Sequence, residues 1–410
     1  MPIAAVPAYL GENFGSASPG MRFGMYLRLW GVNSRTGELH WTKENKVSAL
    51  AEAARINAND KAVMAALYVR QHRMFKSCPP ESGLLLDAVT TAPFTTGLGN
   101  EHPLENGFAF LNPYGLPYLP GSGVKGVLRQ AARELARGEW GDSSGWGDAE
   151  ITALFGREGE PGDTLHQRGA LIFWDVIPQI KGDALQVEIM TPHQSHYYQQ
   201  KSDRNAGGSV SPHDSGQPLP ITFLSVPPGS GFAFFVLCDC MLLRRTAPEL
   251  MQNDKWKELL ISAFEHAFTW CGFGAKTSVG YGAMREDQQK KGERRKEEEA
   301  RQEELRRREE SAAREKEIAM MDPVDREIAR YLDARPDKNQ PEINALINGL
   351  KSNAWSEDLV VAIAERLKAR MQAEKRWKEK SEKKNPGKDR DYVRTQEVMK
   401  YLSKSRSESR

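Results

Sequence analysis

Residues 119–129 have the sequence LPGSGVKGVLR, in which a glycine-rich turn leads directly into a helix. Apolar residues recur at positions 124, 128, 131 and 135, which is the spacing of an amphipathic helix. The sequence therefore predicts a helix over 123–138. The glycines also match the G-x-G-x-x-G spacing of a dinucleotide-binding turn, but three prolines precede them and disfavour the buried strand that such a turn requires.

The same turn has the chemistry of an anion site. Small residues at 121–123 let another backbone approach closely, and the first N–H groups of a helix attract phosphate. Lys125 and Arg129 follow on the same helix, one turn apart. The alternative is that these cations only form the solvated face of a helix.

A second glycine-rich stretch, GFGAKTSVGYG, covers residues 272–282. It lacks the glycine spacing of a nucleotide-binding P-loop, so an NTPase is disfavoured. It offers instead one cation, Lys276, and two aromatic rings, Phe273 and Tyr281, which are components of single-stranded nucleic-acid sites. A tight turn ahead of an edge strand is the alternative interpretation.

The polar stretch 191–218 contains His193, His196 and Tyr197. Together with His213, the two histidines could serve as zinc ligands, but their spacing matches no common zinc pattern. We therefore expect no metal and no cofactor. We interpret the histidines and Tyr197 as residues of a solvent-exposed loop that either take part in loop chemistry or stack on RNA.

Charge is nearly balanced over the whole chain but unevenly distributed along it. The 410 residues include 57 Lys and Arg and 55 Asp and Glu. Residues 1–284 carry 24 basic and 27 acidic side chains, a net charge of −3, whereas residues 366–410 carry 16 basic and 7 acidic side chains, a net charge of +9. The positive charge therefore lies in a tail, where it can attract polyanions.

Several classes of protein are disfavoured by the sequence. The longest apolar stretch is interrupted by Asp239 and is too short to span a bilayer. The first residues lack the basic region of a signal peptide, and the four cysteines form no C-x-x-C pair. We expect a cytoplasmic protein with reduced thiols and no membrane partner.

The first 284 residues form a body with mixed secondary structure. Strands are expected over 21–30, 84–89, 169–177, 185–190, 221–226 and 231–243, and the strand 185–190 can pair with 169–177. Helices are expected over 47–75, 123–138 and 248–268, together with a short helix that ends at Gly156. This order is typical of an α+β, ferredoxin-like (RRM-like) domain with insertions, in which helices cover one sheet face and leave the other free.

The rest of the chain is a charged extension. Residues 285–317 are expected to form a single-helix linker, because pairs such as Glu303–Arg307 and Glu304–Arg308 support a solvated helix without an apolar stripe. Residues 318–372 are expected to form a small helical appendage, and 373–410 a basic, disordered tail.

The glycine-rich motifs occur in a characteristic order. PGSGVKGVLR is followed by LFG, RGALIFWDV and GFGAKTSVGYG, and the stretch 91–129 is TAPFTTGLGNEHPLENGFAFLNPYGLPYLPGSGVKGVLR. Over about 15–285 the chain resembles the RAMP proteins of CRISPR systems and, among them, the sixth subunit of the type III-B (Cmr) effector complex. The resemblance implies a ferredoxin-like domain at residues 1–284 that binds RNA.

It also implies a function in antiviral defence. The family's sixth subunit binds guide RNA, caps its 3′ region beside the first, fourth and fifth subunits, and leaves cleavage of target RNA to the fourth. The expected RNA contacts are Gly121, Ser122, Gly123, Lys125, Gly126, Arg129, Gly272, Gly274, Lys276, Thr277, Gly280, Tyr281 and Gly282, with His193, His196 and Tyr197 as further possible contacts.

Two other functions stay open at this point. A RAMP-type ribonuclease could use His193 or His196 as acid or base, or Asp203 or Asp214 with a metal. A purely structural bridge would make the cations on the 123–138 helix incidental. We expect a protein that is not an enzyme, because the sequence contains no paired acid and base.

Overall fold

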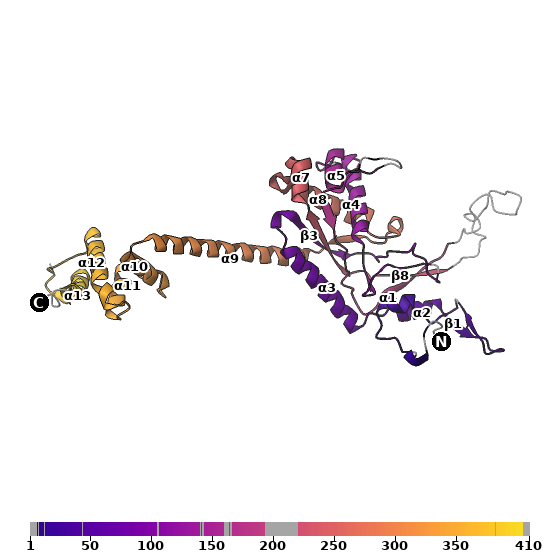
Figure 1. Cartoon of the computed structure of the whole chain (residues 1–410), viewed down its shortest axis with the longest axis horizontal. Coiled ribbons are helices and arrows are strands. Elements are labelled where there is room, and N and C mark those ends of the chain that lie inside the picture. The colour runs from indigo at the N-terminus through magenta and orange to yellow at the C-terminus, as the bar shows by residue number, and fades with distance from the viewer. Residues whose placement is uncertain are drawn as a thin grey trace. The chain divides into compact units, whose positions relative to one another are not determined.

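A computed structural model of the chain divides it into two compact units, residues 1–294 and 295–410, here called the N-terminal and the C-terminal unit (Figure 1). The structure describes all residues except 1–5, 7, 12, 43, 105, 140, 142, 160–163, 165, 193–219, 382 and 405–410. Among the described residues, no helix is long and apolar enough to cross a membrane.

The N-terminal unit is built on a four-stranded sheet in which every neighbouring pair is antiparallel. Its strand order is β10 (Met284–Glu286), β3 (Gly83–Thr90), β9 (Gly231–Cys238), β6 (Leu171–Phe173). The helices α4 (Gly121–Ala136) and α5 (Asp148–Phe155) lie between β3 and β6 in the chain, and α7 (Cys240–Thr246) and α8 (Lys255–His266) lie between β9 and β10. The predicted α+β class is confirmed.

One face of this sheet packs against α4 and α8. Alternate residues of β9 point to this face, and Phe234 lies there with 1% of its surface exposed. Its ring centroid is 5.2 Å from that of Phe264 on α8 and 5.0 Å from that of Phe273. Burial of such rings is among the largest sources of stability in a core.

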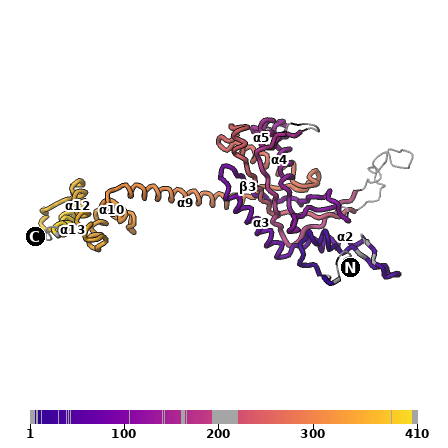
Figure 2. The backbone as a smooth tube through the Cα atoms, viewed as in Figure 1, coloured from indigo at the N-terminus to yellow at the C-terminus, as the bar shows by residue number. Residues whose placement is uncertain are grey.

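The opposite face of the sheet is also covered, so the expectation of a free face is wrong. Helix α3 (Ala58–Lys76) lies beside the sheet (Figure 2), and its aromatic side chains contact β9. Phe235, which points to this side of β9, is 1% exposed and lies 5.5 Å from Phe75, 6.2 Å from Tyr68 and 5.6 Å from Trp174, measured between ring centroids. An aromatic layer therefore fills the space between α3 and the sheet.

A buried carboxylate of β3 ties the first turns of α9 (Gln288–Met320) to this covered face. Asp87 is 4% exposed and accepts hydrogen bonds from Nε and Nη2 of Arg294. The same guanidinium donates to the Tyr68 hydroxyl at 2.9 Å and lies 3.0 Å from Nε2 of His72. The N-terminal unit therefore extends to Arg294, beyond the expected boundary at residue 284, because Asp87 requires a cation.

The N-terminal helices also differ from the expected pattern. Residues 21–30, expected as a strand, contain most of helix α1 (Pro19–Gly24), and strand β1 (Trp30–Val32) begins only at the end of that range. The side chain of Ser18 caps α1 by accepting a hydrogen bond from the backbone N–H of Met21. This cap favours a helical turn where the sequence was expected to form a strand.

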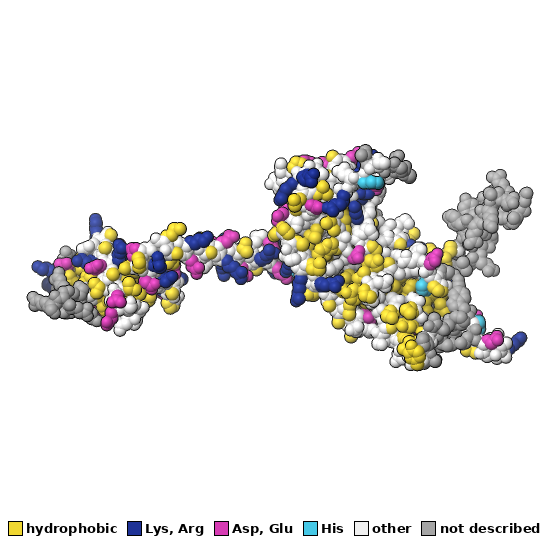
Figure 3. Space-filling view, in the orientation of Figure 1, with side chains coloured by type: hydrophobic (Ala, Val, Ile, Leu, Met, Phe, Trp, Pro, Cys, Tyr) yellow, Lys and Arg dark blue, Asp and Glu magenta, His cyan; other side chains and the backbone are white. Residues whose placement is uncertain are grey.

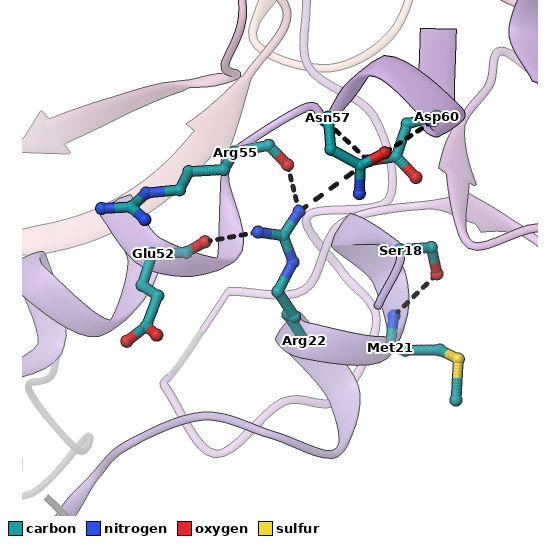
Figure 4. A network of polar contacts seen from close by, with 7 residues as sticks. All are labelled: Ser18, Met21, Arg22, Glu52, Arg55, Asn57 and Asp60. Carbon is teal, nitrogen blue, oxygen red and sulfur yellow. Dashed lines mark hydrogen bonds and ion pairs between the residues drawn. The ribbon is translucent and has the colours of Figure 1, made fainter. Parts of the chain in front are cut away.

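A buried arginine joins α1 to the next two helices (Figure 4). Arg22 is 4% exposed, and its guanidinium donates to the carbonyl oxygens of Glu52, at 3.0 Å, and of Arg55. Its Nη2 lies 4.0 Å from a carboxylate oxygen of Asp60. These bonds cluster where the expected helix 47–75 divides into α2 (Lys46–Ala53) and α3, which begins with a capping box between Asn57 and Asp60.

Three small sheets complete the N-terminal unit. Their strands are β1 with β2 (Leu39–Trp41), β4 (Phe110–Leu111) with β5 (Leu116–Pro117), and β7 (Gln186–Met190) with β8 (Ile221–Ser225). The expected pairing of 185–190 with 169–177 is wrong, since β7 pairs with β8. The expected strand 231–243 ends at Cys238, and the expected helix 248–268 consists of a 3-10 segment, Pro248–Asp254, and α8.

The C-terminal unit has its own apolar core. It is formed by α10 (Pro323–Ala334), α11 (Glu342–Lys351), α12 (Glu357–Ala373) and α13 (Arg390–Lys404). Leu346, Leu367 and Val398 are fully buried there. The stretch 373–410, expected to be disordered, thus contains a packed helix, because Val398, Tyr401 and Leu402 supply an apolar face among the charges.

Helix α9 is stabilised by its own ion pairs. Figure 3 shows basic and acidic side chains interspersed along it. Glu303 pairs with Arg307 at 3.1 Å and Glu304 with Arg308 at 2.5 Å, which confirms the two predicted i,i+4 pairs. The only buried residue of α9 is Ile318 near its end.

Replacing Arg294 should destabilise the N-terminal unit. In Arg294→Ala, Asp87 would stay buried without its cation, so we expect a loss of about 3 kcal/mol in the free energy of unfolding. Urea unfolding followed by tryptophan fluorescence measures it. The matched control is Arg295→Ala, since Arg295 is 77% exposed and pairs only with Glu299. Equal stability of the two variants would show that the Asp87–Arg294 pair does not hold α9 in place.

Candidate nucleic-acid interface

The N-terminus of α4 is the first predicted anion site, and a protein carboxylate already binds it. The backbone N–H of Gly121 donates to Oδ1 of Asp175 at 2.7 Å. A Cβ atom on Gly121 would lie 2.3 Å from the carbonyl oxygen of Phe173. Gly121 is therefore required for close packing of α4 on the end of β6, and a phosphate would compete there with Asp175.

The outer side of the same helix turn is more accessible. Ser122 and Gly126 are exposed, while Gly123 and Lys125 are half-buried. A Cβ atom on Gly126 would meet nothing within 4 Å. Burial, and then the charge of Arg129, lower the pKa of Lys125. Ser122, Lys125 and Gly126 thus form a surface that a phosphate backbone can approach.

Arg129 is engaged within the protein. Its Nη2 donates to the carbonyl oxygens of Phe155, at 2.6 Å, and Gly156, at 2.9 Å, at the end of α5. Its Nη1 donates to Glu158 at 2.9 Å. Hydrogen bonds from Arg133 and Arg129 lower the pKa of Glu158. Arg129 therefore caps the C-terminus of α5, and RNA would compete with these internal partners for its guanidinium.

The second predicted site, residues 272–282, is a loop whose shape depends on glycine. Gly274 has a φ of +89° and Gly282 a φ of +72°. A Cβ atom would lie 2.2 Å from the carbonyl oxygen of Thr95 at the first position and 1.8 Å from that of Phe273 at the second. Gly272 also has a positive φ, of +68°, and is buried. These glycines let the loop fold back on itself.

The tip of this loop is open to solvent. Gly280 has a φ of +94° with nothing within 4 Å of an added Cβ, and Val279 is 70% exposed. Thr277 begins the single 3-10 turn Thr277–Val279 and is half-buried. An exposed glycine without neighbours allows an extended backbone to approach the tip closely.

Two side chains of the loop face the β7–β8 hairpin. Nζ of Lys276 lies 5.4 Å from the ring centroid of Phe223 and 2.7 Å from the sulfur of Met190. Tyr281 lies 5.7 Å from Phe223, and burial, followed by the charge of Glu188 and a hydrogen bond with it, raises the pKa of Tyr281. Lys276 and Tyr281 therefore both lie beside Phe223, and their contact with RNA stays a prediction.

The prediction that Phe273 offers a second ring for stacking is wrong. Its ring is fully buried among Phe234, Phe264 and Phe268. The candidate loop contacts His193, His196 and Tyr197 lie outside the described residues, as do His213, Asp203 and Asp214. Lys276 contacts Met190, which lies three residues before His193 in the chain. The predicted contacts of the histidines with RNA stay predictions.

The two predicted sites approach different parts of α4. The 272–282 loop begins next to Cys271, whose sulfur lies 3.8 Å from a carboxylate oxygen of Glu134. Glu134 lies nine residues after Lys125, or about 13 Å along a helix that rises about 1.5 Å per residue. The two predicted groups of residues are therefore separate from each other on the described part of α4.

Sequence reasoning missed a polar cluster of Glu134, His266 and Cys271. Nε2 of His266 lies 2.7 Å from Oε2 of Glu134, and the three possible ligand atoms lie within 4.8 Å of one another. Burial, followed by Glu134, raises the pKa of the Cys271 thiol to about 12. Within the described residues this is the group that could hold a metal, but the protonated thiol is a poor ligand at neutral pH.

The better interpretation of this cluster is a hydrogen-bonded link. Glu134 also accepts a hydrogen bond from Gln130, so its carboxylate joins α4 to the π-helical turn Ala267–Cys271 that precedes the glycine-rich loop. Burial alone would raise the pKa of Glu134, but hydrogen bonds from His266 and Gln130 lower it below its ordinary value of 4.5. The cluster therefore supports the base of the loop.

Glu134→Gln should change the acid stability of the protein. A carboxyl group whose pKa is lower in the folded state stabilises that state above pH 4.5 and loses this contribution as the pH falls below that value. The wild-type protein should therefore lose stability more steeply than Glu134→Gln below about pH 5. Thermal unfolding from pH 7 to pH 3 tests this, with the exposed Glu139→Gln as control. Parallel curves for all three proteins would contradict a stabilising ionised Glu134.

The chain has recognisable relatives. Residues 87–285, which include β3, α4 and both glycine-rich motifs, match the model of the RAMP superfamily. This match agrees with the RAMP resemblance expected from the sequence. The chain is also similar to the CRISPR system Cmr subunit Cmr6 of Pyrococcus furiosus (strain ATCC 43587 / DSM 3638 / JCM 8422 / Vc1).

The similarity to this Cmr6 protein amounts to 27% identity over 244 residues, which cover 48% of this chain. The match spans 66% of the length of that relative, just under two thirds. The predicted resemblance to the sixth Cmr subunit is thereby confirmed.

Solved structures of CRISPR complexes and subunits also resemble the chain in part. The type III-B Cmr-beta complex bound to cognate target RNA contains a chain with 19% identity and a TM-score of 0.41, over 60% of this chain and 71% of that one. The crystal structure of Cmr6 from Pyrococcus furiosus gives 24% identity and a TM-score of 0.27, over 50% and 97%. Superpositions this partial do not define the fold.

Proposed function

We propose that this chain is an RNA-binding assembly subunit of a type III-B CRISPR effector complex. The observation that carries the proposal is the sequence similarity to Cmr6 across the RAMP region, which contains both glycine-rich motifs. Its partners would be guide RNA, target RNA and the first, fourth and fifth subunits of the complex. In that complex it would cap the 3′ region of the guide in antiviral defence.

The sheet supports a ferredoxin-like assignment for the RNA-binding domain. Numbered by position in the chain, the four strands have the order fourth, first, third, second, with helices after the first and the third. A β-α-β-β-α-β chain has this connectivity. We propose that the pairs β4–β5 and β7–β8 are insertions in this domain and that the β1–β2 pair, which precedes β3, is an addition before its first strand.

The proposed contacts with guide RNA lie on loops at the edge of the domain. The open tip around Gly280, with Lys276 beside it, would take the sugar–phosphate backbone, and Tyr281 offers a partly accessible ring. Ser122, Lys125 and Gly126 would contact a second stretch of backbone. The sheet itself is an unsuitable site, because α3 covers its second face.

We propose that the subunit does not cleave RNA. Three histidines of the described chain have structural partners: His72 lies against Arg294, His266 binds Glu134, and His102 contacts the carbonyl oxygen of Phe23 at 3.0 Å. Burial lowers the pKa of His102. None of these groups is free to act as a general base.

Neutralising Lys125 and Lys276 should weaken retention of guide RNA in the reconstituted complex. Each lost phosphate contact lowers the slope of log K against log salt by about 0.7 for a single strand, so the double alanine variant should lose about 1.4. Filter binding across a salt series measures the slope. Arg244→Ala/Arg245→Ala, which removes two exposed charges from α7, is the matched control. An unchanged slope in the Lys125/Lys276 variant would assign both lysines to a solvated surface.

The purified chain should leave RNA intact. Incubation with guide or target RNA, with and without Mg²⁺, should give no time-dependent products on a denaturing gel. Cleavage that disappears in His193→Ala, His196→Ala or Asp214→Ala would instead support the ribonuclease alternative. Cleavage that persists in all three would indicate a contaminating nuclease.

A further inference from the structure

The acidic side chains of the C-terminal unit are largely neutralised within it. Arg366 pairs with Asp322 at 2.7 Å, Arg370 with Glu342 at 3.0 Å, and Arg314 with Asp333 at 3.0 Å. These pairs connect α9, α10, α11 and α12. These three arginines are therefore already paired with carboxylates of the protein.

The connection between α12 and α13 is different. Residues 375–390, here called the basic loop, carry eight basic and three acidic side chains, a net charge of +5. Lys380, Lys384 and Lys388 are exposed, and none of them pairs with a carboxylate among the described residues. The positive charge of the loop is thus directed to solvent.

The basic loop has a fixed shape. The backbone N–H of Lys378 donates to Oγ1 of Thr395 at 3.0 Å, and Thr395 is fully buried on α13. Ser381 donates through its hydroxyl to the carboxylate of Asp389 at 3.3 Å, and Asp389 is 4% exposed. Trp377 packs against the core of the unit. A loop held at several points loses little conformational entropy when it binds a partner.

We propose that the basic loop binds the phosphate backbone of RNA, giving the chain a second RNA contact outside its RAMP region. This inference rests on the proposed function for the choice of RNA as the polyanion. Lysine is a flexible point charge suited to phosphate, and a run of lysines follows a backbone without reading its sequence. The contact would therefore be independent of sequence and sensitive to salt.

The composition of the loop favours RNA over a protein or a membrane. Protein interfaces are depleted in lysine and contain apolar residues at their centre. In the described part of the basic loop, no large apolar side chain is exposed. A helix that binds a membrane surface needs an apolar face to insert, and that is missing here too.

The test uses the full-length chain with Lys380, Lys384 and Lys388 replaced by Ala. The probe is a fluorescent single-stranded RNA of about 40 nucleotides, followed by anisotropy across a salt series. Loss of three phosphate contacts should lower the slope of log K against log salt by about 2, and the affinity by up to about a hundredfold at roughly 0.1 M salt. Circular dichroism should show that the helices are retained.

The matched control removes the same charge from the same unit. Lys296→Ala/Lys316→Ala/Lys338→Ala changes three exposed lysines outside the basic loop and should leave the slope nearly unchanged. Equal slopes for both triple variants would overturn the inference. So would loss of binding to phosphatidylserine vesicles, or to a polyglutamate peptide, with RNA affinity unchanged.

The outcome also separates this inference from the proposed function. If the Lys125/Lys276 variant loses guide RNA while the loop variant binds RNA like the wild type, the basic loop has no RNA contact and the proposed function stands. If the loop variant loses RNA binding and the Lys125/Lys276 variant keeps it, the basic loop binds RNA and the proposed RNA contact of the RAMP region is wrong.

Discussion

The burial of both faces of β3 and β9 is the constraint on which the rest of the structure depends. Phe234 and Phe235 are neighbours in the chain, point to opposite faces, and are each 1% exposed. Helix α3 covers the part of the second face around Phe235, so a nucleic acid cannot reach that part of the sheet. Because Asp87 is buried, its charge needs the cation of Arg294. This ion pair attaches the first turns of α9 to the N-terminal unit.

Local patterns in the sequence predicted the elements whose stability is local. The apolar spacing of α4 and the apolar run Leu84–Leu86 of β3 are visible in the chain, and both elements form where expected. The strand expected over 21–30 was wrong there because a Ser–Pro cap and the tertiary contacts of Arg22 favour helix α1. The covering role of α3 could not be predicted, because its packing residues, Tyr68 and Phe75, meet Phe235 from more than 150 positions away in the chain.

The sequence predicted where the candidate site lies better than it predicted what each of its residues does. Gly121 and Gly282 are required for internal packing, whereas Gly126 and Gly280 are exposed and an added Cβ atom would meet nothing within 4 Å. Arg129 looked like a free cation because its partners, the carbonyl oxygens that end α5, carry no sequence signal. Asp175 lies inside the strand expected over 169–177, and only the fold shows that its carboxylate meets the α4 N-terminus.

Electrostatics divides the molecule into regions that satisfy their own charges and regions that do not. Helix α9 satisfies its charges internally through pairs such as Glu303–Arg307, so it adds little attraction for a polyanion. Lys125, Lys276 and the basic loop differ, since no carboxylate among the described residues pairs with Lys125, Lys276 or Lys384. If both units contact one RNA, each raises the effective concentration of the other's site. Two weak, salt-sensitive surfaces can then act together more tightly than either alone, without a deep pocket in the described part of the chain.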